Sequence, residues 1–363
     1  MRFAIIGAGV IGRLHAQTIQ ALKPRAELVA VVDVIPERAQ QLAAEHGVDA
    51  LTSLDEALAR SDVDAVTICT PSGMHADAAV PALDAGKHVI VEKPLDINLE
   101  AARRVAEAEK RSDRTIMVVS QHRHDPASLI VHEAVKSGKF GRLTSGSATI
   151  SWWRSQSYYD SGDWRGTWAL DGGGALMNQG IHTIDLFRWF LGEPVEVYAW
   201  AECLAHERIE VEDTAVATVR FANGALGVVH GTTAAYPGLT TQIRVHGDRG
   251  SAIIDHDELV YYHAAPEDAE DFPYGAGGRA NQAAEVLAAA GVGPKDEPAE
   301  GPTIAGLQAT SHTTQFEHFL DAVEHGRPVL VTVDEAMQTL GLIRGIYESA
   351  RTQQPVKIKE LVS

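Results

Sequence analysis

The sequence predicts an α/β protein in which a doubly wound parallel (Rossmann) sheet is followed by an α+β domain with a large open, mostly antiparallel sheet. Over the first 120 residues, short apolar runs alternate with helical patterns, and this alternation is typical of parallel strands joined by helices. After about residue 121, longer strands and hairpin signals replace that rhythm. Because 363 residues suffice for about two domains, we expect domains at residues 1–122 and 123–363.

The elements of the first domain follow from its apolar runs and helix signals. We expect strands at residues 3–6, 28–32, 65–69, 89–91 and 115–119, and helices at 10–22, 76–85 and 99–111. Pro36 and Gly47 mark the start and end of another helix, and Ser53 with Glu56 has the spacing of a capping box. Strands that are apolar throughout indicate burial on both faces, as in a parallel sheet.

The second domain combines alternating strands with helices. We expect strands at residues 143–153, 215–221, 242–246 and 251–255, and helices at 127–136, 174–191, 314–325 and 334–351. Asn223-Gly224 and the segment 247–250 are hairpin turn signals. Residues 264–310 are rich in Pro, Gly, Ala and acidic residues, so we expect a loop there, with a short helix at 283–290.

Charge and cysteine content restrict the partners and the compartment. The chain has 31 basic and 49 acidic residues, a formal net charge of -18. Such a surface repels phosphate backbones and anionic lipids, so we expect neither nucleic acid nor membrane as a partner. Two cysteines cannot form a disulfide framework. The chain start lacks a signal-peptide pattern, and no run reaches the ~18 to 20 apolar residues of a membrane span. We therefore expect a cytoplasmic protein.

Residues 7–12 have the pattern G-x-G-x-x-G between a predicted strand and a predicted helix, which is the context of a dinucleotide site. Gly7 permits a tight turn, Gly9 lets the backbone approach a pyrophosphate, and Gly12 lets the helix pack closely. Val10 and Ile11 open that helix, whose terminal N–H groups favour phosphate. A glycine-rich turn that binds nothing is the alternative, and the surrounding strand and helix argue against it.

Asp33 ends the second predicted strand, at the position where dinucleotide folds place an acidic residue. A carboxylate there can accept hydrogen bonds from the adenine ribose hydroxyls, and it would repel a 2′-phosphate. The sequence therefore predicts NAD as the cofactor, in preference to NADP.

A second cluster of polar residues suits proton transfer. Glu92-Lys93-Pro94 follows the fourth strand, at the edge where open α/β sheets bind ligands. On a helix, Asn178, His182 and Asp185 share one face. A free lysine has a pKa of about 10.4, and partial burial could lower the pKa of Lys93 to that of a useful base.

Each of these residues also has a structural alternative. Lys93 could be a solvated lysine, His182 could cap its own helix, and Asp185 could orient a neighbour instead of binding a substrate hydroxyl. No second His, Cys or Glu pair at ligand spacing accompanies His182 and Asp185, so we predict no metal.

The aromatic segment 152–165 precedes the His182 helix. Aromatic rings offer flat apolar faces to sugar C–H groups, and arginines bind carboxylate or phosphate with two hydrogen bonds. We predict that Tyr158 and Arg165 contact the substrate. The alternative is that the aromatic side chains only pack against the sheet edge.

Together these motifs resemble the Gfo/Idh/MocA family of oxidoreductases, named for glucose-fructose oxidoreductase and inositol dehydrogenase. The resemblance covers nearly the whole chain, and it rests on the glycine motif, Thr70-Pro71 with His75, the triplet 92–94 and the run 172–185. It implies a cis Lys93–Pro94 peptide, and a substrate bound between the domains beside the nicotinamide. In relatives the large sheet often builds dimers or tetramers, so we expect a homodimer or homotetramer formed through it.

The resemblance also implies roles for individual residues. Thr70, Pro71 and His75 are similar to the cofactor-contacting loop of the family, and Glu92 with Lys93 borders the cofactor. Gln121 and Arg123 are similar to a junction motif near the nicotinamide, where Gln121 would contact the cofactor and Arg123 the substrate. An interdomain ion pair of Arg123 is the alternative.

The sequence departs from the polyol dehydrogenases of the family at one position. Many of them carry Lys, Asp and His in the active site; Lys93 and His182 match, but Asn178 replaces the Asp. Since Asn cannot accept a proton, proton transfer falls to Lys93 and His182, with Asn178 left to orient a substrate hydroxyl or the histidine. Asn here also resembles a branch that includes nucleotide-sugar 3-dehydrogenases.

The resulting prediction is an NAD-dependent dehydrogenase of a carbinol carbon. Its substrate would be a cyclic sugar, a sugar acid, a nucleotide sugar or an inositol-like polyol. Two alternatives remain: an NAD-dependent glycosidase that works by transient oxidation and elimination, and a nucleotide-sensing regulator without catalysis. Lys93 and His182 argue against the regulator, but they do not separate the two enzymes.

Overall fold

The computed structural model of the chain describes residues 1–266, 281–293 and 304–362. They pack into two units, each assembled from separate stretches of sequence. The N-terminal unit contains residues 1–121, 169–172 and 299–340, and the sheet unit contains residues 122–168, 173–298 and 341–363. The domain boundary between residues 122 and 123 stays a prediction from the sequence.

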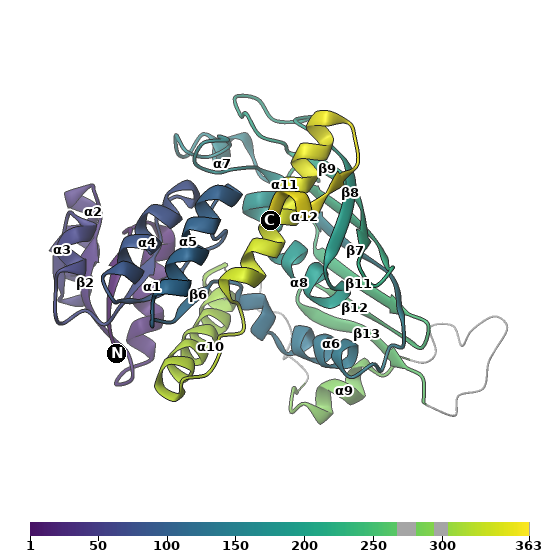
Figure 1. Cartoon of the computed structure of the whole chain (residues 1–363), viewed down its shortest axis with the longest axis horizontal. Helices are drawn as coiled ribbons and strands as arrows, with labels where there is room; N and C mark the ends of the chain where they lie inside the picture. Colours follow the sequence, from purple (N-terminus) through teal and green to yellow (C-terminus); the bar gives the residue numbers. More distant parts are fainter. Residues whose placement is uncertain (267–280, 294–303, 363) are drawn as a thin grey trace. The chain divides into compact units, whose positions relative to one another are not determined.

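The N-terminal unit is built on a parallel sheet (Figure 1), which has six strands among the described residues, in the order β3-β2-β1-β4-β5-β6. They are β1 (Arg2–Ile6), β2 (Glu27–Val32), β3 (Asp49–Leu51), β4 (Ala65–Ile68), β5 (His88–Val91) and β6 (Ile116–Val118). This order is that of dinucleotide-binding folds, whose ligand crevice lies where the winding reverses, here at the carboxyl ends of β1 and β4. The predicted doubly wound sheet is confirmed.

Helices flank this sheet and supply its core. Their bounds are α1 (Val10–Ala21), α2 (Pro36–His46), α3 (Leu54–Leu58), α4 (His75–Asp84), α5 (Leu99–Arg111) and α10 (Ile304–His325), with single 3-10 turns at Ser72–Met74 and Gln121–His124. Helix α11 (Val333–Thr352) starts in this unit and continues into the sheet unit from residue 341 on. Pro36 opens α2 and Gly47 closes it with φ 68°, as predicted. Phe316 and Phe319 of α10 pack against Phe3 in one buried core cluster with α1.

Two local predictions for this unit are wrong. Residues 304–310 were expected in a loop, but α10 begins at Ile304, because a helix that has formed extends at little cost per residue and can include residues whose composition favours a loop. Residues 267–280 and 294–303 of the same predicted loop lie outside the described residues. The capping-box bond of Ser53 is absent, since its side chain accepts no hydrogen bond from α3.

The sheet unit is built on a mixed sheet that has eight strands among the described residues, in the order β13-β12-β11-β7-β10-β9-β8-β14. They are β7 (Leu143–Ser151), β8 (Pro194–Glu202), β9 (Thr214–Phe221), β10 (Leu226–Thr232), β11 (Thr241–Gly247), β12 (Gly250–Asp255), β13 (Glu258–Ala264) and β14 (Val356–Lys357). Only β7 and β10 run parallel among these pairs. The large, mostly antiparallel sheet is therefore confirmed.

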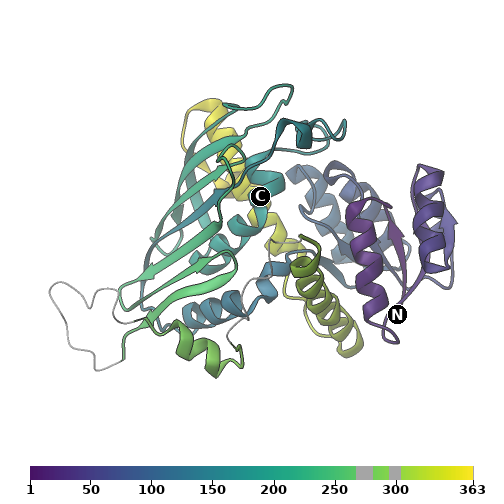
Figure 2. The ribbon, with the colours of Figure 1, turned by 180° about the vertical axis from the view of Figure 1, so that it is seen from behind.

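One face of this sheet is covered by helices, as Figures 1 and 2 show from opposite sides. The helices of the unit are α6 (Pro126–Lys136), α7 (Gln156–Tyr159), α8 (Ile181–Leu191), α9 (Ala283–Ala289) and α12 (Ile358–Val362). On the other face, apolar side chains are exposed: Trp200 and Leu226 are each 55% accessible, and Val216 and Val228 lie beside them on the central strands. This open face is large enough to associate with another protein surface.

The predicted helix over residues 174–191 is not regular. Residues Ala175–Gly180 form a π-helical turn, and the α-helix α8 starts at Ile181. Such turns often occur at functional sites. No helix in the described ranges is long and apolar enough to cross a membrane.

Candidate functional site

The glycine-rich turn between β1 and α1 has the geometry of a phosphate-binding loop. Gly7 has φ 104°, and a Cβ there would lie 2.6 Å from the Cys69 carbonyl oxygen. A Cβ on Gly12 would lie 2.1 Å from the Gly7 carbonyl oxygen. Only glycine at position 12 therefore lets helix α1 lie this close to the turn. No atom lies within 4 Å of the Cβ position of Gly9. The backbone at Gly9 therefore faces open space, as an approaching pyrophosphate requires.

Asp33 connects this turn to the start of α2. Its carboxylate accepts one hydrogen bond from the Ala8 N–H at 2.8 Å and another from the Ile35 N–H at 2.9 Å. Each oxygen keeps acceptor capacity for a further donor. The orientation of the carboxylate is thus fixed by the backbone, in the position where dinucleotide folds hold the ribose hydroxyls.

Further residues of the predicted cofactor site fit an amide-bearing ligand. Thr70 Oγ1 and Gln121 Oε1 are buried and have no hydrogen-bond partner within the described residues, a condition that calls for an additional donor or acceptor. Both residues follow strands, β4 and β6, at the carboxyl edge of the sheet. Pro71 precedes the short turn Ser72–Met74. Val10, which opens α1, is 82% exposed.

His75 is placed differently from what the resemblance suggests. It is 1% exposed, and its two ring nitrogens lie 2.7 Å from the Pro94 carbonyl oxygen and 3.0 Å from the Thr70 carbonyl oxygen. Burial lowers the pKa of His75. The ring therefore joins the loop after β4 to the loop after β5, and direct contact with the cofactor stays a prediction.

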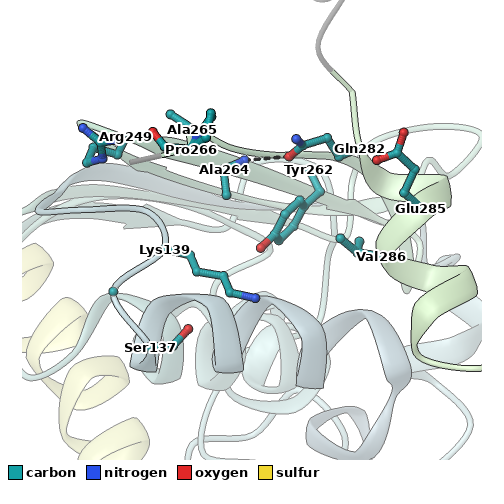
Figure 3. Close-up of a pocket in the computed structure, with 11 residues that line it drawn as sticks. Ser137, Lys139, Arg249, Tyr262, Ala264, Ala265, Pro266, Gln282, Glu285 and Val286 are labelled. Atoms are coloured by element: carbon teal, nitrogen blue, oxygen red, sulfur yellow. Dashed lines mark hydrogen bonds between the residues drawn. The ribbon is translucent and has the colours of Figure 1, made fainter. Parts of the chain in front are cut away.

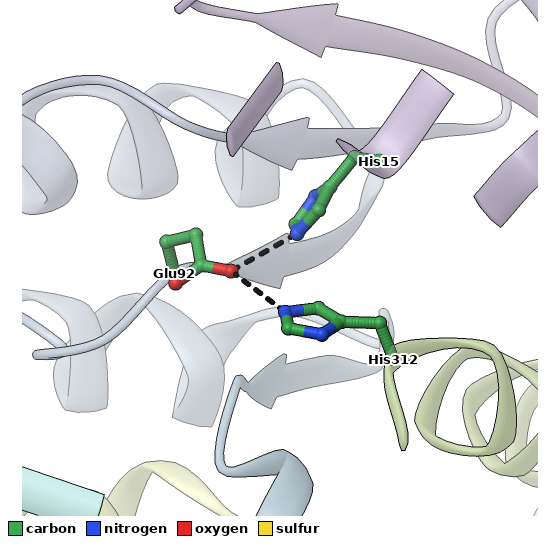
Figure 4. Close-up of side chains that lie close together, drawn as sticks. All are labelled: His15, Glu92 and His312. Atoms are coloured by element: carbon green, nitrogen blue, oxygen red, sulfur yellow. Dashed lines mark hydrogen bonds and ion pairs between the residues drawn. The ribbon is translucent and has the colours of Figure 1, made fainter. Parts of the chain in front are cut away.

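Glu92, at the end of β5, is the centre of a buried cluster with two histidines (Figure 4). Its Oε1 lies 3.0 Å from His15 Nε2 on α1 and 3.6 Å from His312 Nε2 on α10. Burial alone would raise the pKa of Glu92, but the hydrogen bonds from both histidines lower it well below its usual range. Burial lowers the pKa of His15. The Thr67 Oγ1 atom lies 2.6 Å from His15 Nδ1, so the hydroxyl forms a hydrogen bond with that nitrogen.

The remaining oxygen of Glu92 contacts the backbone of the predicted base. Glu92 Oε2 accepts a hydrogen bond from the Lys93 N–H at 3.2 Å, and the Lys93–Pro94 peptide is cis, as the resemblance implies. The carboxylate thus binds two imidazoles and one backbone N–H. The cluster fixes the start of the loop that carries Lys93.

In the sheet unit, a buried carboxylate supports the turn that carries Asn178. Glu212 accepts hydrogen bonds from the N–H groups of Gly174 and Leu176, at 3.0 and 2.9 Å, and from the Tyr347 hydroxyl at 2.8 Å. A Cβ on Gly174 would lie 2.0 Å from the Glu212 carbonyl oxygen. Burial raises the pKa of Glu212 to about 7, although these hydrogen bonds oppose that shift. The glycines of the run 172–174 are therefore required by close packing.

Asp185 does not share a solvated face with Asn178 and His182. It is 4% exposed and forms two hydrogen bonds, each of 2.7 Å, with the guanidinium of Arg123, which is fully buried. Asp185 is buried because α8 is buried almost all round, and Asn178 lies in the π-helical turn before it, where the residue spacing differs from that of an α-helix. Arg123 and Asp185 pair with each other within one unit, and direct contact with a substrate stays a prediction for both.

His182 is half-buried, and its ring contacts His122 edge to face, with 5.1 Å between the ring centroids. His122 Nδ1 lies 2.8 Å from Asp125 Oδ2 and 3.3 Å from Asp257 Oδ1. Burial would lower the pKa of His122, but these carboxylates raise it to about 10. Asp257 and its neighbour His256 form the β12–β13 turn with φ of 64° and 48°, values that cost conformational energy for residues other than glycine.

Tyr158 and Arg165 lie together, as a shared role requires. Arg165 Nη1 donates a hydrogen bond of 2.6 Å to the Tyr158 hydroxyl. Gln179 Nε2 donates to the same hydroxyl at 2.8 Å and to Asn178 Oδ1 at 3.2 Å. This chain of contacts links the aromatic segment to the turn before α8. Lys93 belongs to the N-terminal unit and His182 to the sheet unit.

Several residues of this environment carry no signal in the sequence. None of the predictions from the sequence singled out this set of residues, which are His15, His312, His122, Asp257, Glu212 and Tyr347. Two of the groups, His15–Glu92–His312 and His122–Asp125–Asp257, have possible metal-ligand atoms within 4.8 Å of one another. Their ring nitrogens and carboxylates already bind one another, and the absence of a metal stays a prediction.

A surface pocket lies elsewhere in the sheet unit (Figure 3). It has a volume of about 470 Å³ and is lined from the end of α6, from β13 and from α9, with Lys139, Tyr262 and Gln282 among its residues. Gln282 Oε1 accepts a hydrogen bond of 2.9 Å from the Ala264 N–H. The pocket contains none of the predicted site residues.

Comparisons with known proteins agree with the fold and the cofactor site. Residues 1–120 match the model of an oxidoreductase family with an NAD-binding Rossmann fold, and residues 129–253 match the GFO/IDH/MocA C-terminal domain. The chain is 30% identical to inositol 2-dehydrogenase of Rhizobium meliloti over 272 residues, which are 74% of this chain and 79% of the relative. It is 31% identical to myo-inositol 2-dehydrogenase of Thermotoga maritima over 266 residues, 70% and 75% of the two chains.

Solved structures give the same result over almost the full length. The WlbA dehydrogenase of Bordetella pertussis, in complex with NADH and UDP-GlcNAcA, is 30% identical, with a TM-score of 0.82 and 98% of each chain covered. A levoglucosan dehydrogenase in complex with NADH is 25% identical, with a TM-score of 0.83 and 99% of each chain covered. The chain therefore belongs to the Gfo/Idh/MocA family and is an NAD-dependent oxidoreductase.

Proposed function

We propose that the protein transfers a hydride between NAD and a carbinol carbon of a cyclic sugar, sugar acid, nucleotide sugar or inositol-like polyol. This proposal rests on the contacts around two side chains that we propose for proton transfer. Lys93 follows the buried Glu92 cluster, and His182 opens α8 beside the His122 ring. Relatives act on or bind inositol, levoglucosan and UDP-GlcNAcA, which belong to the same chemical range.

Lys93 is proposed to take the proton of the reacting hydroxyl. When bound, NAD supplies the hydride acceptor, and the protein supplies orientation and a base. Since the Glu92 carboxylate is engaged by two histidines and a backbone N–H, Glu92 acts in this proposal by fixing the backbone of Lys93. His182 is proposed to hydrogen-bond a substrate hydroxyl, and Asn178 to orient that hydroxyl.

The cofactor site is proposed to favour NAD over NADP through Asp33. Gly7, Gly9 and Gly12 would admit the pyrophosphate, and Val10 and Ile11 would present the N–H groups of the first turn of α1. The buried, unpaired Thr70 Oγ1 and Gln121 Oε1 would bind the cofactor. Pro71 and His75 would fix the loop around Thr70.

We also propose that the chain forms a homodimer or homotetramer through the open face of the eight-stranded sheet. Trp200, Val216, Leu226 and Val228 expose apolar surface there. Sedimentation of the wild type and of Trp200→Glu tests this assembly: the wild type should sediment as an oligomer and the variant as a smaller species. A monomeric wild type would contradict the proposal. A cytoplasmic location stays a prediction.

The substrate class is tested by NADH formation from NAD over a panel of free sugars, sugar acids, inositols and UDP-sugars. Lys93→Ala should abolish the reaction that the wild type shows, and Lys110→Ala, an exposed lysine of the same unit, should leave it unchanged. If the wild type binds NAD but reduces it with no member of the panel, net dehydrogenation is contradicted. Cleavage of glycosides without net NADH would then identify the redox-neutral glycosidase.

A further inference from the structure

Two arginines and a tyrosine form one stacked group in the segment before the π-helical turn. The Arg165 guanidinium carbon lies 4.3 Å from the centroid of the Tyr158 ring and 4.6 Å from that of Trp164. The Arg154 guanidinium carbon lies 5.4 Å from the Tyr158 ring and 4.9 Å from the Trp152 ring. Tyr158 thus lies next to both cations. We call Arg154, Tyr158 and Arg165 the stacked arginine group.

Among the residues that the structure describes, no carboxylate pairs with either cation of this group. In the described part of the chain, Arg165 bonds to the Tyr158 hydroxyl and Arg154 to the Trp153 carbonyl oxygen, at 2.6 and 3.0 Å, and neither forms an ion pair. The acidic residue Asp160 of the same segment pairs with Arg208 instead. Two unpaired, half-buried positive charges thus lie side by side in a protein whose net charge is -18.

The group is connected to the proposed reactive residues. Gln179 donates one hydrogen bond to the Tyr158 hydroxyl and another to Asn178 Oδ1, and α8 with His182 begins directly after this turn. A ligand held by the arginines would therefore lie within the reach of a sugar-sized molecule from Asn178. All of these contacts lie inside the sheet unit.

We propose that the stacked arginine group binds the negatively charged group of the substrate, a carboxylate or a phosphate. This inference rests on the proposed function and narrows it: a sugar acid or a nucleotide sugar is favoured over a neutral sugar or inositol. A planar guanidinium binds either anion through two parallel hydrogen bonds. Stacking on aromatic rings holds both guanidinium planes before the ligand arrives, which lowers the entropy lost on binding.

The test compares matched ligands by calorimetry on the NADH-loaded protein. D-Glucuronate and D-glucose differ by a carboxylate, and UDP-glucose adds a diphosphate to glucose. We expect at least one charged ligand to bind about tenfold or more tightly than glucose, the size expected for a hydrogen-bonded charge. Tighter binding of glucuronate would identify the carboxylate as the preferred anion, and tighter binding of UDP-glucose would identify the phosphate.

Arginine variants separate recognition from packing. Arg165→Gln and Arg154→Gln should remove most of the preference for the charged ligand and leave the Kd of glucose within about threefold. Arg208→Gln, which removes an arginine outside the segment that pairs with Asp160, should leave the preference intact. Equal binding of charged and neutral ligands, or a preference that both variants retain, would overturn the proposal.

The binding measurement tests the stacked arginine group separately from the proposed reaction. If charged ligands bind through these arginines but NADH never forms, the stacked arginine group is supported and the dehydrogenase fails. If a neutral polyol is oxidised efficiently and no charged ligand binds, the dehydrogenase is supported and the stacked arginine group fails.

Discussion

Lys93 and His182, the residues proposed for proton transfer, lie beside two different kinds of buried charged group. Near Lys93, one buried carboxylate contacts the imidazoles of His15 and His312 and a backbone N–H. Near His182, the His122 ring pairs with Asp125, and Asp185 of the same helix as His182 pairs with Arg123. The first arrangement places the carboxylate at the start of the loop that carries Lys93. The second places ion pairs beside α8.

This difference predicts different responses to substitution. A carboxylate such as Glu92, which is held by two imidazoles and a backbone N–H, can be replaced by an amide of the same shape, because the amide keeps one acceptor oxygen. A member of a buried ion pair cannot be replaced in this way, because its partner then stays charged and buried without an opposite charge. Stability should therefore depend most on the sheet unit, and catalysis should depend most on the N-terminal unit.

The largest effect on stability is expected at the Arg123–Asp185 pair. Arg123→Leu should lower the free energy of unfolding by about 3–5 kcal/mol, because it leaves the Asp185 carboxylate buried and unpaired. The double variant Arg123→Leu with Asp185→Leu should recover part of that loss. Urea denaturation measures both, and Arg208→Leu serves as the exposed control with no measurable change. A double variant less stable than either single variant would contradict the pairing.

The next effect concerns the Glu92 cluster. Glu92→Gln keeps the shape and one acceptor, so the fold should survive with a loss of about 1–3 kcal/mol. The kcat should fall by about tenfold to a hundredfold, because the amide NH₂ no longer accepts a hydrogen bond and the start of the Lys93 loop shifts. Steady-state kinetics on the substrate found in the panel measure it. A loss confined to the KM of NAD would instead indicate direct cofactor contact by Glu92.

The third effect is a pH dependence of stability from His122. Its pKa is raised to about 10 in the folded protein, against about 6.5 in an unfolded chain. The stabilisation is therefore complete below about pH 6.5 and is lost as the pH rises toward 10. Unfolding measured from pH 6 to 10 should show this decline, and Asp257→Asn should flatten it. An equal slope in both proteins would show that Asp257 does not hold the proton on His122.

The smallest effect is expected at Asp33. Asp33→Asn should weaken NAD binding by about tenfold, because a charged acceptor for the ribose hydroxyls is lost. It should weaken NADP binding less or improve it, because the repulsion of the 2′-phosphate disappears. Calorimetric titration of both cofactors gives the ratio, and an unchanged ratio would remove Asp33 from cofactor selection.

The sequence predicted the local features of the fold well because they depend on short-range signals. The strand before Gly7, the helix opened by Pro36 and the hairpin at Asn223-Gly224 are each encoded within a few residues. The start of α10 at Ile304 was missed because residues 304–310 lie in a stretch whose composition favours a loop, whereas the part of α10 that packs with β1 and α1 lies farther along, at Phe316 and Phe319. The short strands β3 and β14 have too few residues to form a pattern.

The same distinction applies to the candidate site. Lys93, Asn178 and Tyr158 were found because each lies in a contiguous motif. The histidines around Glu92 come from residues 15 and 312, and Asp257 reaches His122 from a turn of a distant hairpin. Such partners have no fixed spacing, so only the fold brings them together. The burial of Asp185 was missed because its partner Arg123 comes from a distant part of the chain.

The central proposal is that Lys93 and His182 both take part in the same proton transfer. Rates of NADH formation for Lys93→Ala, His182→Ala and the double variant test it directly, with the Kd of NAD measured for each. Residues that act as one group are strongly non-additive. The claim predicts that the double variant is about as slow as the slower single variant, with NAD binding unchanged. Losses that multiply, or a single variant that keeps the wild-type rate, would contradict it.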